Sequence, residues 1–323
     1  MMRSGQARPA PVRAIFMCDV SASSAHHVRR WCEAGHEVAA FIISHRGQKS
    51  RWRRDRWRRI FAPDWSLART LRRNRIPLIQ APRDLQDREF LSKVDRLAPD
   101  VLISVGFHQR IPDALTARCR HGGLNLHPAL LPHYRGPLPV QAMVIDRTLD
   151  RYGGVTLHRI AYGFDEGDIV AQAPLTAKDR DEPEWLAIAH ARLGAELLLS
   201  SVPAFCAGLQ RAHPQPKGDF RYARLTAEDL LLSPAMAIAD LVLRAKAIGP
   251  LGGLQLSLDG QMYEISGVSR VTDRRTGARS KVSVRSIEFD ASDGRIRMVR
   301  DGRTARRLHD IRLLQKLRKT SLT

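Results

Sequence analysis

Short apolar runs alternate with helical patterns through the first two hundred residues. Arg13 to Cys18 and Glu37 to Ile43 are short and rich in apolar residues, which is typical of strands, and Ala25 to Ala34 between them has helical spacing that Gly35 ends. The pattern continues with a helix over Asp87 to Leu97, strands over Val101 to Val105, Leu124 to His127 and Val155 to Arg159, and a helix over Glu184 to Leu209. Strands that alternate with helices predict a Rossmann-like α/β fold, with a mostly parallel sheet covered on both faces.

The pattern changes after residue 207. Arg211 to Asp219 is polar and contains two prolines, as linkers do. A helix is then expected over Pro234 to Lys246, and strands over Leu254 to Leu258, Met262 to Val268, Lys281 to Asp290 and Arg295 to Arg300. This pattern predicts a smaller β-rich domain, a barrel or a sheet with one helix. The expected organisation is a tail at 1–12, a first domain at 13–207, a linker at 208–219 and a second domain at 220–323, whose basic stretch Leu308 to Lys319 is either a terminal helix or a loose tail.

The net charge of the 323-residue chain is +20, from 53 Lys and Arg against 33 Asp and Glu. Such a field attracts polyanions, although a GC-rich genome also enriches Arg, so charge alone leaves a polyanion partner open. No run approaches the ~18 apolar residues of a membrane span, and Met1 to Val12 lacks the apolar core of a secretory signal. The four cysteines have neither CxxC nor zinc-site spacing. We therefore expect a cytoplasmic protein without metal or disulfide.

One segment concentrates the positive charge. Arg46 to Arg59 holds seven Arg and one Lys beside the single Asp55, with Trp52 and Trp57 interleaved. Guanidinium groups among aromatic rings suit phosphate contacts and base stacking. A solvated loop or helix whose tryptophans pack on the domain is the other interpretation. The candidate polyanion contacts are Arg51, Arg53, Arg54, Arg56, Arg58 and Arg59.

The window GLNLHPALLPHYRG, residues 123–136, carries the candidate chemistry. Asn125 and His127 are two apart on a strand, so their side chains leave the same face, and Pro128 ends that strand at the sheet edge where ligands of open α/β folds bind. Asp165 lies in a turn beside Gly167 and is free to approach. An amide, an imidazole and a carboxylate at one edge can stabilise an oxyanion and move a proton. Each residue alone is also a common strand end or turn former.

Together these residues resemble the folate-dependent formyltransferase family, which includes methionyl-tRNA formyltransferases, glycinamide ribonucleotide transformylases and nucleotide-amino-sugar N-formyltransferases. The family pattern Asn-x-His-Pro-Ser-Leu-Leu-Pro, Arg-Gly, Gly-Val-Thr and Leu-Asp-x-Gly-Asp-Ile corresponds here to Asn125 to Pro132, Arg135-Gly136, Gly154 to Thr156 and Phe164 to Ile169. The similarity extends over roughly residues 13 to 207. Beyond residue 219 the chain more weakly resembles the OB-like C-terminal domain of the tRNA enzymes and of the enzyme that formylates UDP-4-amino-arabinose. Two departures are Ala129 in place of Ser, and a first loop, Asp19 to Ser24, without the usual Gly and Phe.

The resemblance implies 10-formyltetrahydrofolate as donor and a primary amine as acceptor. Asn125 would donate a hydrogen bond to the formyl oxygen, His127 would add a second one if protonated, and Asp165 would hold His127 and help to take up the amine proton. The implied donor-binding residues are Gly106, Phe107, Ile111, Pro112, Ala129, Leu130, Leu131, Pro132 and Phe164, and the implied acceptor-side residues are Arg135, Gly136 and His158.

The acceptor is open at this point. Gly154 to Arg159 resembles the branches that act on amino sugars and other small substrates, which favours an amine on a nucleotide-linked sugar or similar small anionic molecule. The net charge, the second domain and the Arg-rich segment favour methionyl-tRNA instead. A catalytically idle relative that binds RNA or another polyanion is a further alternative, against which Asn125, His127 and Asp165 argue. A folate-hydrolysing variant would be expected to carry an N-terminal regulatory domain, and we expect none.

Overall fold

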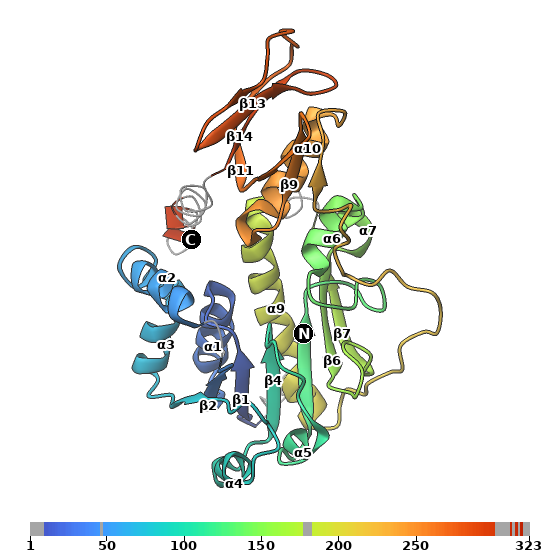
Figure 1. Cartoon of the computed structure of the whole chain (residues 1–323). Coiled ribbons are helices and arrows are strands. Elements are labelled where there is room, and N and C mark those ends of the chain that lie inside the picture. Colours follow the sequence, from blue (N-terminus) through green and yellow to red (C-terminus); the bar gives the residue numbers. More distant parts are fainter. Residues whose placement is uncertain are drawn as a thin grey trace, which may run out of the picture.

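A seven-stranded sheet forms the centre of the larger part of the molecule (Figure 1). The computed structural model describes residues 10–45, 48–176 and 183–300, with single positions between 311 and 318. The strands are β1 (Arg13–Cys18), β2 (Glu37–Ile43), β3 (Leu78–Gln80), β4 (Val101–Val105), β5 (Gly123–His127), β6 (Gly154–Arg159) and β7 (Ile169–Pro174). Their order is β3-β2-β1-β4-β5-β6-β7. The first five are parallel, whereas β6 pairs antiparallel with both β5 and β7. The prediction of a mostly parallel, Rossmann-like sheet is confirmed.

Helices bury both faces of this sheet. They are α1 (Ala22–Glu33), α2 (Gln48–Phe61), α3 (Leu67–Arg73), α4 (Arg88–Leu97), α5 (Asp113–Thr116), α6 (Pro139–Ile145), α7 (Leu149–Tyr152) and α9 (Pro183–Cys206), with a 3₁₀ turn at Pro63–Trp65. Residues of α1, α3 and α9 share one core cluster with Phe16 of β1, and α4 and α5 share the other with Ile15 and Met17. Alternate residues of one strand therefore enter opposite cores, as a pleated strand requires.

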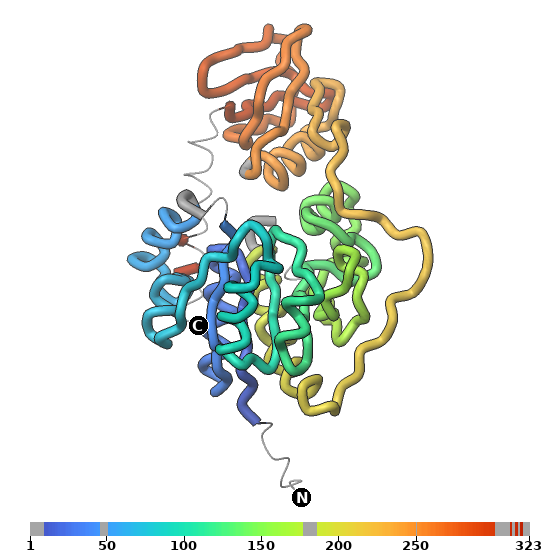
Figure 2. Tube along the Cα trace, turned by 60° about the horizontal axis from the view of Figure 1, so that its bottom comes forward, coloured from blue at the N-terminus to red at the C-terminus, as the bar shows by residue number. Residues whose placement is uncertain are grey.

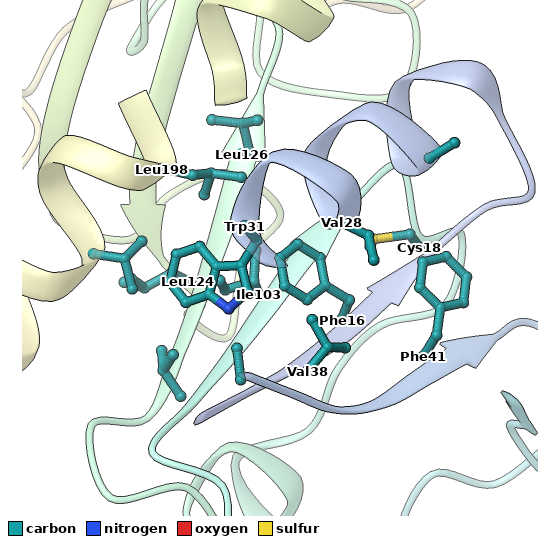
Figure 3. Packing of buried hydrophobic residues seen from close by; sticks show 14 of the residues in the cluster. Phe16, Cys18, Val28, Trp31, Val38, Phe41, Ile103, Leu124, Leu126 and Leu198 are labelled. Carbon is teal, nitrogen blue, oxygen red and sulfur yellow. The ribbon is translucent and has the colours of Figure 1, made fainter. Parts of the chain in front are cut away.

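The start of α1 differs from the predicted helix by three residues. The helix begins at Ala22 because the Ser21 side chain accepts a hydrogen bond from the Ser24 backbone N–H, at 3.1 Å, and so caps it. Its last residue is Glu33, and Gly35 follows at φ +90°. At its far end, Trp31 is fully buried against Phe16, with ring centroids 5.9 Å apart, and its indole N–H donates to the Glu37 carbonyl (Figure 3).

The C-terminal part forms two small sheets around one core, above the large sheet in Figure 1. Its elements are β8 (Leu231–Leu232), α10 (Ile238–Ala247), a 3₁₀ turn at Gly249–Leu251, β9 (Gln255–Leu258), β10 (Gln261–Glu264), β11 (Gly267–Thr272), β12 (Lys281–Val282), β13 (Ser286–Asp290) and β14 (Arg295–Val299). The sheet orders are β10-β9-β8 and β11-β14-β13-β12. The β-rich second region with one helix is confirmed, and two sheets stand where a single barrel was one of the expectations.

Two predicted strands are each divided. Met262 to Val268 is shared between β10 and β11, because the chain leaves one sheet for the other at Ile265 and Ser266. Lys281 to Asp290 is interrupted between β12 and β13, where Ser283 and Ser286 bond to each other in a tight turn. Apolar periodicity predicts extended chain in both cases, but it carries no information on where one strand ends and the next begins.

The predicted linker, residues 208–219, runs outside the large sheet between the end of α9 and the C-terminal part (Figure 2). It has irregular backbone but is bonded to the sheet, since the Gln210 side chain donates to the Val170 carbonyl at 2.6 Å. Separate folding of the two regions stays a prediction. The terminal stretch Leu308 to Lys319 lies almost entirely outside the described residues, as do the tail at 1–9 and Arg46.

Candidate active site

Two neighbouring strands present polar side chains at the carboxyl end of β5. Asn125 and His127 lie on β5, and the antiparallel register places His158 of β6 opposite Asn125. On the other side, Ser104 of β4 pairs with Asn125. Because the side chains of paired residues project from the same face of a sheet, this register brings an amide, two imidazoles and a hydroxyl together.

Asp165 completes this group from the turn between β6 and β7. Its Oδ1 lies 3.2 Å from Asn125 Nδ2 and 3.4 Å from His158 Nε2. Its Oδ2 lies 3.4 Å from His127 Nδ1 and accepts the Gly136 backbone N–H at 2.9 Å. The carboxylate is thus surrounded by donors, and the three residues singled out from the sequence meet at one point.

The protonation states of this group follow from its surroundings. Burial acts to raise the pKa of Asp165, but His127, His158 and the Gly136 N–H together outweigh it and lower that pKa to about 2. Burial lowers the pKa of His127, against the opposing effect of Asp165. Asp165 is therefore ionised and His127 neutral at pH 7. The expectation of a protonated His127 gives way to a neutral imidazole that can accept a proton.

A carbonyl determines which nitrogen of His127 is available. Its Nε2 lies 2.8 Å from the Tyr134 carbonyl oxygen, which can only accept, so Nε2 carries the hydrogen. The lone pair of the neutral ring is consequently on Nδ1, on the side of Asp165. A proton taken up at Nδ1 would be stabilised by the neighbouring carboxylate.

Asn125 is more engaged than its expected role suggests. Its Nδ2 donates one hydrogen to Asp165 and lies 3.0 Å from His158 Nε2. His158 Nδ1 lies 2.9 Å from the Arg159 carbonyl and so carries the hydrogen of the neutral ring, which leaves Nε2 to accept the second amide hydrogen. To donate to a substrate oxygen, Asn125 must release one of these two bonds.

An open pocket with an empty volume of about 1230 Å³ lies over this group. Apolar walls from Phe107 and Ile111 face the polar catalytic edge, and Tyr162, Phe164 and Tyr222 stand at its rim, each largely exposed. Known ligand sites combine apolar walls with a few convergent polar groups in this way. Among the residues that the structure describes, no cluster of ligand-type side chains could hold a metal ion, and no helix is long and apolar enough to cross a membrane.

Comparison with known proteins decides the family. The model of the formyl transferase family matches residues 14–202, more than half of the chain. The chain belongs to the formyl transferase family. The methionyl-tRNA formyltransferase of Limosilactobacillus fermentum is 29% identical over 67% of this chain and 69% of its own.

Solved structures agree with this membership at the level of the fold. An N-formyltransferase from Helicobacter canadensis, in complex with folinic acid and dTDP-3-aminofucose, has a TM-score of 0.56 at 15% identity, with 90% of this chain and 99% of that chain covered. HypX from Aquifex aeolicus has a TM-score of 0.60 at 15% identity, and 90% of this chain spans 44% of the HypX chain. This formyl transferase therefore is a formyl-transferring enzyme, and its formyl donor is a tetrahydrofolate derivative.

The residues that the resemblance assigns to donor binding divide into two groups in this formyl transferase. Gly106, Phe107, Ile111 and Phe164 line the pocket. Pro112 precedes α5, and the stretch from Ala129 to Pro132 lies beneath the pocket without lining it. Ala129 is fully buried, and its carbonyl accepts a hydrogen bond from Thr156 at 2.6 Å. For this stretch the expectation of a pocket wall is wrong, because the chain turns under the end of β5 after Pro128.

The acceptor-side residues divide in a similar way. Gly136 and His158 line the pocket, whereas Arg135 turns away to bond the Gln215 side chain. The sequence missed Gln215 and the rim residue Tyr222, which reach the site from beyond α9. A polar residue in a proline-containing linker carries no signal that would have indicated either contact.

The Arg-rich segment forms α2, and only part of it is available to a partner. Arg58 is buried beside Asp55, at 3.2 Å, and Arg51 pairs with Asp19, so the expectation of polyanion contacts by these two does not hold. Arg54 is half-buried. Arg53, Arg56 and Arg59 are exposed and line a hollow with Trp52, beside the exposed Trp57, Ile60 and Phe61. We call Arg53, Arg56 and Arg59 the α2 cationic face.

Proposed function

We propose that this enzyme transfers the formyl group of 10-formyltetrahydrofolate to the amine of methionyl-tRNA. The observation that favours a large polyanionic acceptor is the α2 cationic face, because three exposed guanidinium groups exceed what a single diphosphate needs. Arg53, Arg56 and Arg59 have no ion-pair partner among the described residues. The similarity to methionyl-tRNA formyltransferases points the same way.

The α2 cationic face is connected to the active site through its own helix. Arg51, one turn before Arg54, pairs with Asp19, and its Nη2 lies 3.2 Å from Nε2 of His108. His108 is itself part of the pocket lining. A nucleic acid bound along α2 would therefore pass beside the mouth of the pocket, with phosphates on the guanidinium groups and Trp57 open to a base.

The catalytic edge supplies the groups that formyl transfer needs. The neutral acceptor amine attacks the formyl carbon, and negative charge develops on the formyl oxygen, where Asn125 donates a hydrogen bond. The proton lost by the amine moves to His127 Nδ1, and Asp165 stabilises the resulting imidazolium. When the bond from the formyl carbon to the folate nitrogen breaks, that nitrogen takes the proton. The products are the formylated amine and tetrahydrofolate.

The walls of the pocket suit the donor. Phe107 and Ile111 offer apolar contacts to a flat pterin, and Ser104 and the exposed Arg110 offer polar ones. Arg110 stacks over the Tyr162 ring at 3.7 Å. We propose that these residues, with Gly106 and Phe164, hold the folate while the acceptor approaches from the side of Gly136.

A nucleotide-linked amino sugar is the second candidate acceptor. The aromatic rim of Tyr162, Phe164 and Tyr222 can stack a nucleobase at the pocket mouth, with exposed fractions of 77%, 56% and 45%. This candidate would leave the α2 cationic face without a function in catalysis. We further propose a cytoplasmic location, where the four free cysteines would stay reduced.

The test is tetrahydrofolate release from 10-formyltetrahydrofolate with either methionyl-tRNA or a dTDP- or UDP-linked amino sugar. A reaction without acceptor and a His127→Ala reaction are run alongside. Release only with methionyl-tRNA supports the proposal. Release only with the sugar nucleotide replaces it with the second candidate, and equal release without acceptor identifies a hydrolase.

A further inference from the structure

The segment between α9 and β8 is bonded to both loops that carry the catalytic groups. Near its start, Ile169 and His213 exchange both backbone hydrogen bonds at 2.8 Å, beside the Asp165 turn. Near its end, the Tyr134 N–H donates to the Arg221 carbonyl at 2.6 Å, beside the carbonyl that orients His127. We call residues 213–223 the strap. The strap follows the sheet instead of hanging free between the two regions.

One side chain of the strap contacts both loops at once. The Gln215 amide oxygen accepts two hydrogen bonds from Arg135, from Nε at 3.0 Å and from Nη2 at 2.6 Å. Its Nε2 donates to the Asp165 carbonyl and to the Gly167 carbonyl, both at 2.8 Å. A primary amide offers two acceptor and two donor positions, so every one of them is used.

The turn that Gln215 holds has a constrained backbone. Asp165 has φ +58°, a left-handed conformation that costs a non-glycine residue roughly 1–3 kcal/mol unless its surroundings impose it. Gly167 leaves no room for adjustment, since a Cβ there would lie 1.8 Å from the Arg159 carbonyl oxygen. The two Gln215 donors are therefore bound to a peptide whose conformation must be maintained from outside.

We propose that Gln215 is a positioning residue for formyl transfer. By fixing the Asp165 peptide, its amide aims the Asp165 carboxylate at His127 Nδ1, 3.4 Å away, and at Asn125 Nδ2, 3.2 Å away. Gln215 does not line the pocket and so acts through Asp165, not on the substrate. The proposal concerns the formyl-transfer step and does not depend on which amine is the acceptor.

Two substitutions separate the donors of Gln215 from its other contacts. Gln215→Glu keeps the size and the acceptor oxygens for Arg135 but replaces the two donors with an oxygen that faces two carbonyls. Gln215→Ala removes all four bonds. Gln210→Ala is the matched control, because its amide also bonds a backbone carbonyl of β7 but does not contact the catalytic turn.

The kinetic measurement uses the full-length enzyme with methionyl-tRNA and 10-formyltetrahydrofolate. We expect kcat to fall roughly 10- to 10²-fold in both Gln215 variants, as for a misplaced catalytic group, with KM for the donor within about twofold. The Gln210→Ala variant should keep the wild-type kcat. A Gln215→Glu variant with wild-type kcat would overturn the proposal, since the tether to Arg135 would then suffice.

A second measurement needs no acceptor. Titration of the histidine ring by NMR, assigned with a His127→Asn spectrum, reports the Asp165 carboxylate, which opposes burial in determining the pKa of His127 alongside His158. In both Gln215 variants that pKa should fall further, by about 1, because Asp165 moves away. An unchanged His127 pKa would overturn the proposal even if kcat fell. Lack of activity with methionyl-tRNA would refute the acceptor while this titration still decided the role of Gln215.

Discussion

The catalytic edge and the α2 helix are both rich in polar side chains, yet they are built in opposite ways. At the catalytic edge, Asn125, His127 and Asp165 are mostly buried, and each is bonded to another protein group. On α2, Arg53, Arg56 and Arg59 stand in solvent, while Asp55 and Arg58 beneath them are buried and paired.

This difference reflects what each region has to do. Charge stabilisation at a reacting atom requires donors held in place before the substrate arrives. Attraction of a polyanion requires only exposed positive charge, whose effect is long-range and weakened by salt. The buried half of α2 is then a support for its exposed half, and the predictions that follow test each part.

The largest effect is expected at the catalytic edge. His127→Ala removes the proton acceptor and should lower kcat about 10³-fold, with donor binding largely intact. Tetrahydrofolate release and the Kd of a folate analogue measure the two quantities. His121→Ala, at the opposite end of β5, is the control, and wild-type turnover in His127→Ala would remove the catalytic edge from the mechanism.

The buried half of α2 comes next. Asp55 is inaccessible and accepts hydrogen bonds from Arg58, Ser66 and the backbone N–H groups of Leu67 and Ala68.

Asp55→Asn places an amide hydrogen among these donors, so we expect a loss of roughly 2–4 kcal/mol in the free energy of unfolding, measured by denaturant titration. The exposed Asp113→Asn should change it by less than about 0.5 kcal/mol. An equally small change in both would show that Asp55 is not a support for α2.

The exposed half of α2 should affect recognition without affecting the fold. Changing Arg53, Arg56 and Arg59 to Gln should lower kcat/KM for methionyl-tRNA roughly 10- to 10²-fold near physiological salt and reduce the salt dependence by about one per lost contact. The exposed Arg88, Arg96 and Arg120, on and near α4, serve as the matched triple control. Identical salt slopes for the two triple variants would argue against RNA on α2.

The smallest effect separates the two regions by pH. Burial lowers the pKa of His27 on α1 to about 4, from 6.5. Because the unfolded chain binds a proton below pH 6.5 that the folded chain refuses down to about pH 4, stability falls across that interval as pH falls.

At pH 5 the loss from His27 should be about 2 kcal/mol relative to pH 8. Asp165, with a pKa of about 2, stays ionised throughout. Denaturant titrations at pH 5 and 8 should therefore differ in wild type and differ less in His27→Gln; equal differences in the two proteins would refute this assignment.

Much of the fold follows from local pattern. Strands such as Val101 to Val105 are continuous apolar runs with a turn on either side, and their alternation with amphipathic helices favours a single kind of sheet. The Asn125 and His127 pair was also predictable, because the period of two on a strand fixes which side chains share a face. The meeting of Asp165 with this pair was predictable only through the whole motif.

The parts that were not predictable depend on contacts between distant segments. Buried Arg58 and exposed Arg56 are two residues apart and chemically identical, so composition cannot distinguish the structural cation from the available one. Ala129 to Pro132 matches the motif but lies beneath the pocket, since the direction of the chain after Pro128 depends on packing against β6.

The sequence by itself determined the α/β class, the family and the identity of the catalytic side chains, because these depend on local periodicity and on residue types at short spacing. Only the tertiary structure decided that His127 is neutral with its lone pair on Nδ1, and that Gln215 reaches the Asp165 turn across 50 residues of chain. Burial and hydrogen-bond partners are properties of neighbours in space, and neighbours in space exist only once the sheet and the strap have folded together.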